Sequence, residues 1–226
     1  MDPLCILPVV ILLVVFSGYQ ALPLLVLALN PHAIRFSFES DQDTRDLLRR
    51  TIHLREWLDR LKDLGFTLLG QKVEKIPLWG PAFRELALVS AEAEAHAGIV
   101  LHPDGTPASL YFYTPIRNGG MVFTRNFQGP EAEGERLSVR NVEHIDFRFI
   151  LNDHLARVRS FRDRGLIPRA GATQAERLAA TAAFYDSEYG RTGLPSLWSP
   201  PIRMFALALA LLVAATIWIF ARQAAG

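Results

Sequence analysis

The sequence predicts an α+β domain held between two hydrophobic helices, one near each end of the chain. Residues 4–29 and 204–221 contain no charged side chain. Between them, a charged segment with leucines at helical spacing precedes short runs of β-branched and aromatic residues separated by turn formers. We therefore expect an antiparallel β-meander of about five strands packed with helices, flanked by N- and C-terminal transmembrane helices.

The composition indicates that apolar and polar residues are segregated along the chain. Half of the 226 residues are hydrophobic, whereas 21% are charged. The 24 basic and 23 acidic residues leave a formal net charge of +1, which argues against nucleic acid as a partner. A single cysteine, Cys5, excludes a disulfide within the chain.

The first apolar segment, residues 4–29, is predicted to be a transmembrane helix. As a helix it would extend roughly 39 Å, which exceeds the ~30 Å hydrocarbon core of a bilayer. Pro8 and Pro23 predict a kink or a tilt. No basic residue precedes the segment, as one would in a signal peptide. We expect an uncleaved anchor, with a cleaved signal peptide as the alternative.

The next element is predicted to be one amphipathic helix of about twenty residues. Ser40, Asp41 and Asp43 supply an N-cap and early negative charge, and Gly65 is placed to end the helix. Its apolar face is formed by Leu47, Leu48, Ile52, Trp57, Leu58, Leu61 and Leu64.

Five strands are expected after this helix. Apolar and polar or aromatic residues alternate within them, and the connections are short, which favours an antiparallel meander. Turn formers at residues 102–107 and 117–120 separate the last three strands. The expected strands are residues 66–70, 84–91, 98–102, 109–114 and 121–127.

Two helices are expected after the strands. Asn152 or Asp153 is placed to cap a helix that runs to Arg164. Thr173 and Glu176 form a Thr-x-x-Glu capping box for the second helix. These helices would cover the sheet and complete a soluble α+β domain over residues 36–196.

The second apolar segment, residues 204–221, is apolar on every face and is also predicted to be a transmembrane helix. Ala206, Ala210 and Ala214 recur every four residues, a stripe that lets another helix approach closely. The stripe would pack against the first span or a second copy of the chain. The alternative is that the pattern only reflects the abundance of alanine.

Basic residues near the predicted spans set the expected orientation. Arg35, Arg45, Arg49 and Arg50 follow the first span, whereas the N-terminal tail has no basic residue. The positive-inside rule then places the central domain in the cytoplasm. Heavy use of arginine and alanine suggests a bacterial source, so the expected location is a bacterial inner (plasma) membrane.

One loose cluster of titratable residues is a candidate site: His144, Asp146 and His154. Imidazole and carboxylate groups can together bind a divalent metal. The alternative interpretation is a polar loop, a helix cap and ordinary histidines. No nucleophile elbow, phosphate-binding loop, dinucleotide-binding loop or compact metal motif occurs in the sequence. We therefore predict no catalytic residue, cofactor or metal.

Four short segments resemble part of a group of uncharacterised bacterial membrane-anchored proteins. They read RLKDLGFTLLG, LYFYT, MVFTRNFQG and LNDHL and lie between Arg60 and about Leu155. The resemblance implies an α+β domain between two transmembrane helices. It implies no activity and no functional residue.

The leading functional hypothesis is a non-enzymatic, membrane-anchored accessory or interaction protein. Its expected partners are the lipid bilayer and another membrane protein or a second copy of itself. One rival is a ligand- or lipid-binding module with a pocket between sheet and helix. The other is an enzyme that acts on a membrane-borne substrate, with a cleft around His144, Asp146 and His154.

Overall fold

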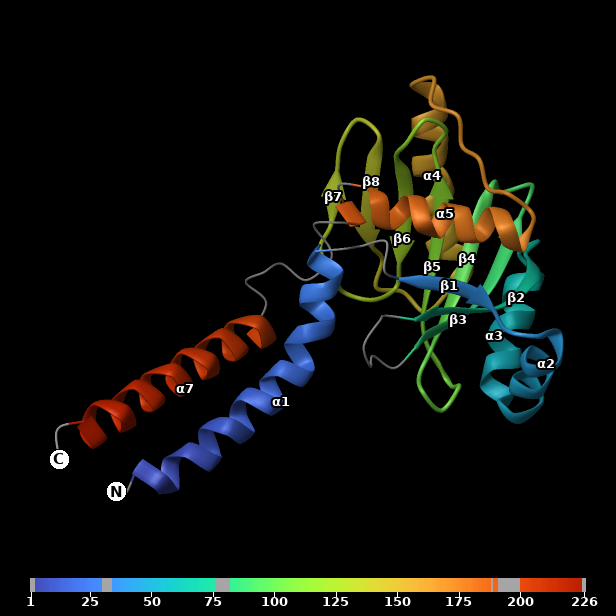
Figure 1. Cartoon of the computed structure of the whole chain (residues 1–226). Helices are drawn as coiled ribbons and strands as arrows, with labels where there is room; N and C mark the ends of the chain where they lie inside the picture. Colours follow the sequence, from blue (N-terminus) through green and yellow to red (C-terminus); the bar gives the residue numbers. More distant parts are fainter. Residues whose placement is uncertain (1–2, 30–33, 76–81, 188, 191–199, 225–226) are drawn as a thin grey trace. The chain divides into compact units, whose positions relative to one another are not determined.

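The computed structural model describes residues 3–29, 34–75, 82–187, 189–190 and 200–224 (Figure 1). It divides the chain into two compact units. The helical unit contains both ends of the chain, and the sheet unit contains the β-strands. Their bounds are Met1–Ala33, Ile76–Gly80 and Arg191–Gly226 for the helical unit, and Ile34–Lys75 and Pro81–Gly190 for the sheet unit.

The helical unit consists of two antiparallel helices, α1 (Pro3–Leu29) and α7 (Pro200–Ala224), that pack along each other. Ser17, Ala21 and Ala208 are buried. A Cβ atom added at Gly18 would lie 3.0 Å from the ring of Phe205, so the missing side chain permits this close packing. Many other large apolar side chains of both helices remain exposed.

The prediction of two transmembrane helices is wrong for the part of the chain that the structure describes. None of its helices is long and apolar enough to cross a membrane. A helix that crosses a bilayer needs about 20 consecutive, predominantly apolar residues. This finding contradicts the predicted spans at residues 4–29 and 204–221. It also contradicts the predicted location in a bacterial inner membrane, which depended on them.

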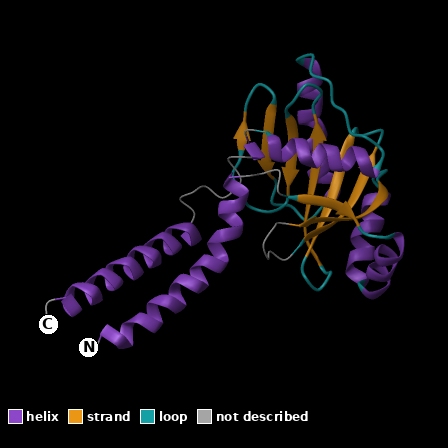
Figure 2. Cartoon of the chain, in the orientation of Figure 1, coloured by secondary structure: helices purple, strands orange, loops and turns teal. Residues whose placement is uncertain are grey.

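The sheet unit is built on one sheet of eight strands, in the order β1-β2-β3-β4-β5-β6-β8-β7 (Figure 2). Strands β1 to β6 are antiparallel neighbours, whereas β8 runs parallel to β6. The strands are β1 (Arg35–Phe38), β2 (Thr67–Lys75), β3 (Phe83–Ser90), β4 (Ala95–Leu101), β5 (Pro107–Pro115), β6 (Met121–Arg125), β7 (Ala132–Glu133) and β8 (Leu137–Asn141).

The predicted five-stranded antiparallel meander is therefore wrong as a description of the sheet, although the α+β class is seen. Strands β1, β7 and β8 were not expected. β1 and β7 are only four and two residues long, too short to show an alternating pattern. The parallel pairing of β8 with β6 arises because the chain first forms β7 at the sheet edge and β8 then pairs between β6 and β7. Local periodicity does not encode this order.

One face of the sheet is covered by α2 (Asp41–Arg50), α3 (Ile52–Lys62) and α4 (Phe147–Asp163). Successive residues of a strand point to opposite faces, so alternate positions of β3, β4 and β5 face these helices. They include Leu86, Ile99 and Phe112, which are fully buried against Leu54 and Ile150 of the helices. This is the main hydrophobic core.

The single amphipathic helix predicted before the strands is two helices. Thr51 has an extended backbone, with φ −117° and ψ 95°, and separates α2 from α3. The other predicted features are confirmed: Ser40 caps the first helix, and Gly65 follows the second with φ +85°. A break at one residue leaves the helical spacing of the leucines intact, so the pattern did not reveal it.

Helix α5 (Gln174–Asp186) lies across the opposite face of the sheet (Figure 1). Its predicted capping box is confirmed: the Thr173 hydroxyl accepts from the amide of Glu176, whose carboxylate accepts from the amide of Thr173. The α4 cap was predicted several residues too late. Asp146 is the N-cap and accepts from the amide of Arg148. The predicted domain end at residue 196 lies outside the described residues.

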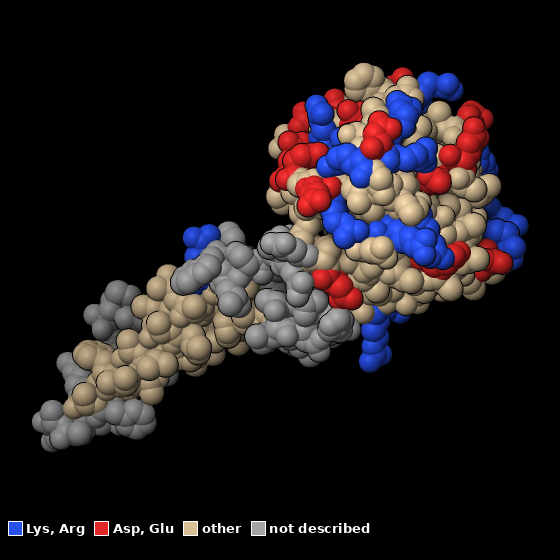
Figure 3. Space-filling view, turned by 90° about the horizontal axis from the view of Figure 1, so that it is seen from above, with Lys and Arg blue, Asp and Glu red and all other residues tan. Residues whose placement is uncertain are grey.

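Charged side chains of both signs are interspersed on the face of the sheet unit shown in Figure 3. No large area of a single sign is visible on that face. Surface pairs such as Lys62 with Asp59 and Arg49 with Asp46 are local helix neighbours, whereas Arg162 of α4 pairs with Glu94, just before β4. Exposed pairs of this kind contribute about 0–1 kcal/mol each, so they do not define the fold.

Candidate functional site

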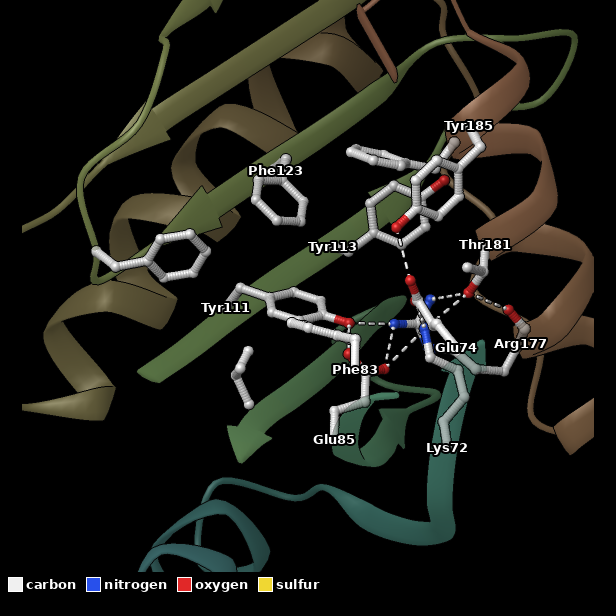
Figure 4. Close-up of a pocket in the computed structure, with 13 residues that line it drawn as sticks. Lys72, Glu74, Phe83, Glu85, Tyr111, Tyr113, Phe123, Arg177, Thr181 and Tyr185 are labelled. Atoms are coloured by element: carbon white, nitrogen blue, oxygen red, sulfur yellow. Dashed lines mark hydrogen bonds and ion pairs between the residues drawn. The ribbon is translucent and has the colours of Figure 1, made fainter. Parts of the chain in front are cut away.

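A cavity of about 110 Å³ lies between the sheet and α5 (Figure 4). Strands β2 to β6 provide its floor, and α5 provides its cover. Its walls are mostly aromatic, with phenylalanines from β3, β6, the segment after β6 and α5, and three tyrosines from β5 and α5. These residues are Phe83, Phe123, Phe127, Phe184, Tyr111, Tyr113 and Tyr185.

Four charged side chains form a buried ion cluster at one end of this cavity: Lys72, Glu74, Glu85 and Arg177. The Nζ atom of Lys72 lies 2.8 Å from Glu74 and 3.0 Å from Glu85. Arg177 donates to the same oxygen of Glu85 at 2.9 Å. Figure 4 shows the side chains converging from two strands and a helix.

The backbone explains why these residues meet. Lys72 and Glu74 are two positions apart on β2 and therefore project from the same face. Glu85 pairs directly with Lys72 across the β2–β3 ladder. Arg177 and Thr181 are four residues apart on α5 and lie on one helix face, where the Thr181 hydroxyl accepts from both Lys72 and Arg177.

The charges of the ion cluster compensate one another. Burial acts to raise the pKa of Glu85, but the neighbouring Lys72 and Arg177 outweigh it and lower this pKa. Burial acts to lower the pKa of Arg177, yet Tyr111 and Glu85 raise it. Both groups are therefore ionised at neutral pH. Removing one partner from a buried pair leaves an uncompensated charge, which typically costs about 3–5 kcal/mol.

Tyr111 connects the ion cluster to the aromatic wall. Its hydroxyl donates to Glu85 and accepts from Arg177, while its ring stacks on Phe123 with centroids 5.1 Å apart. Burial raises the pKa of Tyr111, so the phenol stays protonated. The ring lies directly over Gly98, where a Cβ atom would collide with it. Glycine at this position thus admits the tyrosine to the site.

His96 lies beside the site and is fully buried. Its ring stacks on Tyr113, with centroids 6.3 Å apart. Neither ring nitrogen has a hydrogen-bond partner among the described residues, and the same holds for Nε of Arg177. Burial, followed by the charge of Arg177, lowers the pKa of His96 to about 3, so the imidazole is neutral.

Of the candidate residues predicted from sequence, His144 and Asp146 line a hollow between the end of α3 and the start of α4, whereas His154 is not part of it. His154 is fully buried on the other face of the sheet, where its ring bonds to Thr114 at 2.9 Å and Thr124 at 2.8 Å. Asp146 caps α4, and His144 accepts from its amide. His154 lies about two helical turns beyond that cap. Within the described ranges, no group of His, Cys, Asp and Glu side chains is arranged to hold a metal.

The predicted alanine stripe is exposed. Ala206, Ala210 and Ala214 are solvent-accessible, whereas Ile202 and Ala208 are the buried ones among the described side chains of α7. The structure therefore does not bring the stripe against α1. Packing of the stripe against a second copy of the chain stays a prediction.

Sequence reasoning missed the ion cluster. It offered a pocket between sheet and helix as one rival hypothesis but did not predict which residues line the cavity. The expected strand ended at residue 70, before Lys72 and Glu74. The sequence did carry a signal for the ion cluster, because Lys72 and Glu74 stand at alternate positions on either side of Val73. Charged residues in such a pattern indicate inward-facing charge or an edge strand. Arg177 and Thr181 at i and i+4 gave no signal beyond an ordinary helix face.

The described lining of the cavity offers aromatic ring faces and buried charged groups. Its described lining contains no Ser, Cys or His. The only aliphatic hydroxyl, that of Thr181, donates its proton to the carbonyl oxygen of Arg177 at 3.0 Å and accepts from two cations. An alcohol held in this way has no base to activate it.

The fold and site together define an α+β domain with an aromatic cavity beside buried, compensated charges. Comparison with known proteins found no matching family model, no similar curated protein and no similar solved structure. The resemblance to bacterial membrane-anchored proteins therefore stays a prediction.

Proposed function

We propose that the sheet unit is a binding module that takes up a small molecule, or the end of a larger one, in the cavity between the sheet and α5. The observation that carries this proposal is the composition of the cavity wall. Aromatic rings form most of it, and four buried charged side chains meet at one end. Ligand sites typically combine an apolar lining with a few converging polar groups in this way.

The size of the cavity limits what enters it. Its volume of about 110 Å³ is smaller than the ~150 Å³ of an engineered apolar cavity that binds benzene. A group somewhat smaller than a benzene ring fits completely, and a larger molecule would leave its remainder at the mouth. Phe83, which is 40% exposed, stands at the edge of this lining.

Filling the cavity tests the proposal. Val100 lines it from β4 and is half-buried, so Val100→Phe adds a ring where a ligand would lie. We expect the purified full-length chain to bind one or more small apolar or aromatic fragments, detected by ligand-observed NMR. Val100→Phe should abolish this binding. Because Val100 pairs with Glu85 of the ion cluster across the β3–β4 ladder, the unfolding midpoint of the variant is measured alongside to show that the fold is kept.

Ile145→Phe is the matched control, since Ile145 is 86% exposed and lies outside the cavity lining. This variant adds the same ring and should bind fragments as the unmodified chain does. The proposal fails if no fragment binds, or if every fragment that binds is retained by a folded Val100→Phe variant.

A further inference from the structure

Among the four charged side chains at the cavity, the Glu74 carboxylate is the most accessible. Its side chain is 8% exposed, compared with 1% for Lys72 and Glu85 and 3% for Arg177. Glu74 accepts one bond from Lys72 at 2.8 Å and one from the Tyr185 hydroxyl at 2.6 Å. An ionised carboxylate has about four lone-pair positions, so Glu74 can accept further bonds.

The donors around the cavity are mostly engaged. An ammonium group has three donors, and Lys72 directs its own at Glu74, Glu85 and Thr181. The hydroxyls of the tyrosines that line the cavity also donate within the protein. Tyr185 donates to Glu74, Tyr111 to Glu85, and Tyr113 to the carbonyl of Ala180. The unpaired Nε of Arg177 is buried even from a water-sized molecule.

The remaining capacity of the cavity is therefore to accept hydrogen bonds and to present aromatic faces. Both properties favour a positive charge, because the face of an aromatic ring is the negative end of its quadrupole. The phenylalanine rings at the edge already show this affinity. The guanidinium of Arg125 lies 5.1 Å from the centroid of Phe127 and 5.9 Å from that of Phe123.

Arg125 itself does not occupy the cavity. It is absent from the described lining, and its guanidinium is held by the side chain of Asn141 and the carbonyl of Pro130, both at 2.7 Å. The ion cluster contributes two positive and two negative charges and so leaves no net charge of its own. Arg177 already lies over the rings of Tyr111 and Tyr113, 5.9 Å and 5.7 Å from their centroids. A cation in the cavity would thus meet the phenylalanine rings and the accessible edge of Glu74.

We propose that the cavity recognises a small organic ammonium group, such as a methylated amine head group, with its charge against the ring faces and the Glu74 carboxylate. This inference rests on the cavity being a binding site. A trimethylammonium group has fewer heavy atoms than a benzene ring and so suits the volume of about 110 Å³.

Three probes of nearly the same shape separate charge from size: choline, its neutral carbon analogue 3,3-dimethylbutan-1-ol, and the anion 3,3-dimethylbutanoate. Each is titrated into the purified full-length chain by NMR or calorimetry. We expect choline to bind about tenfold or more tightly than the neutral alcohol, and the anion to bind weakest. Binding should be lost in Val100→Phe, which would place it in the cavity.

Two variants test the assigned contacts. Glu74→Gln keeps the shape but removes the charge, so choline affinity should fall about tenfold while the affinity for the neutral alcohol stays unchanged. Phe127→Leu removes one aromatic ring from the lining, outside the ion cluster. It should lower the affinity for choline more than the affinity for the neutral alcohol. Phe149→Leu, at a 52% exposed position outside the lining, is its control and should change nothing.

The outcomes distinguish this inference from the proposed function. If the neutral alcohol or the anion binds in the cavity as tightly as choline, the ammonium inference is overturned and the binding module stands. If none of the three binds, the inference is also overturned. In that case, the fragment experiment with Val100→Phe decides the proposed function independently.

Discussion

Two buried histidines show how differently one residue type is used within the sheet unit. His154 is bonded on both ring nitrogens, by Thr114 and Thr124, and fixes α4 against the strands. His96 has neither nitrogen bonded among the described residues and lies on the cavity side of the sheet. Burial, followed by the charge of a neighbouring arginine, lowers the pKa of each to about 3.

These two groups predict an acid-sensitive stability. Both folded-state pKa values of about 3 lie below the ~6.5 of an unfolded histidine, so the unfolded chain binds more protons between those limits. Their stabilising contribution is complete above about pH 6.5 and declines as the pH falls towards 3. We expect the free energy of unfolding to drop between pH 6 and 5 with a slope approaching roughly 3 kcal/mol per pH unit.

Urea unfolding at several pH values measures this slope. His154→Gln retains a hydrogen-bonding side chain but removes one titrating group. The pH slope of its free energy of unfolding should therefore be smaller by the contribution of about one proton. His53→Gln, at an exposed position with 77% of its side chain accessible, is the matched control. An equal slope in the unmodified chain and His154→Gln would contradict the assignment.

At the level of the element, the caps of the helices are the features that local sequence encodes most directly. Thr173 and Glu176 satisfy each other's backbone amides at the start of α5, the helix that covers the cavity. Thr51 is likewise the N-cap residue of its helix, α3, but its side chain makes no capping hydrogen bond. The two threonines therefore form a natural pair for comparison.

Thr173→Ala should lower the free energy of unfolding by about 1 kcal/mol, because it removes the acceptor for the amide of Glu176. Thr51→Ala should cost much less, since no capping bond is lost. Chemical denaturation of both variants at pH 7 provides the comparison. Equal losses would show that the capping box of α5 contributes no more than an unbonded threonine.

At the level of the whole molecule, the two units differ in how they bury their residues. The sheet unit has its own core on one face and an aromatic and ionic layer on the other. The members of the ion cluster come from β2, β3 and α5, all within this unit. Every buried charge described in the ion cluster thus finds its partner without the helical unit.

A fragment of residues 34–190 should consequently fold on its own and unfold in a single cooperative transition in denaturant. A fragment of residues 34–169 lacks α5 and leaves Lys72, Glu74 and Glu85 without Arg177, so it should lose several kcal/mol of stability. Far- and near-ultraviolet circular dichroism would measure the unfolding of both fragments in denaturant. A compact form of 34–190 without near-ultraviolet signal would refute the independence of the sheet unit.

Local sequence patterns were enough to predict the α+β class, the cap at Ser40, the capping box at Thr173, the glycine that follows α3 and the approximate positions of five strands. These features depend on residues a few positions apart, where sequence spacing and spatial distance coincide. The prediction failed where one residue changed the outcome, as at Thr51, or where a strand was too short to show a period, as in β1 and β7.

The lining of the cavity and the pairing of the buried charges depend on long-range packing. Lys72 and Arg177 are more than a hundred positions apart, and their meeting depends on which face each strand presents and on where α5 crosses the sheet. The same geometry separates His154 from the cavity and places it in the core. Such long-range placement follows from the packing of whole elements, which no local pattern specifies.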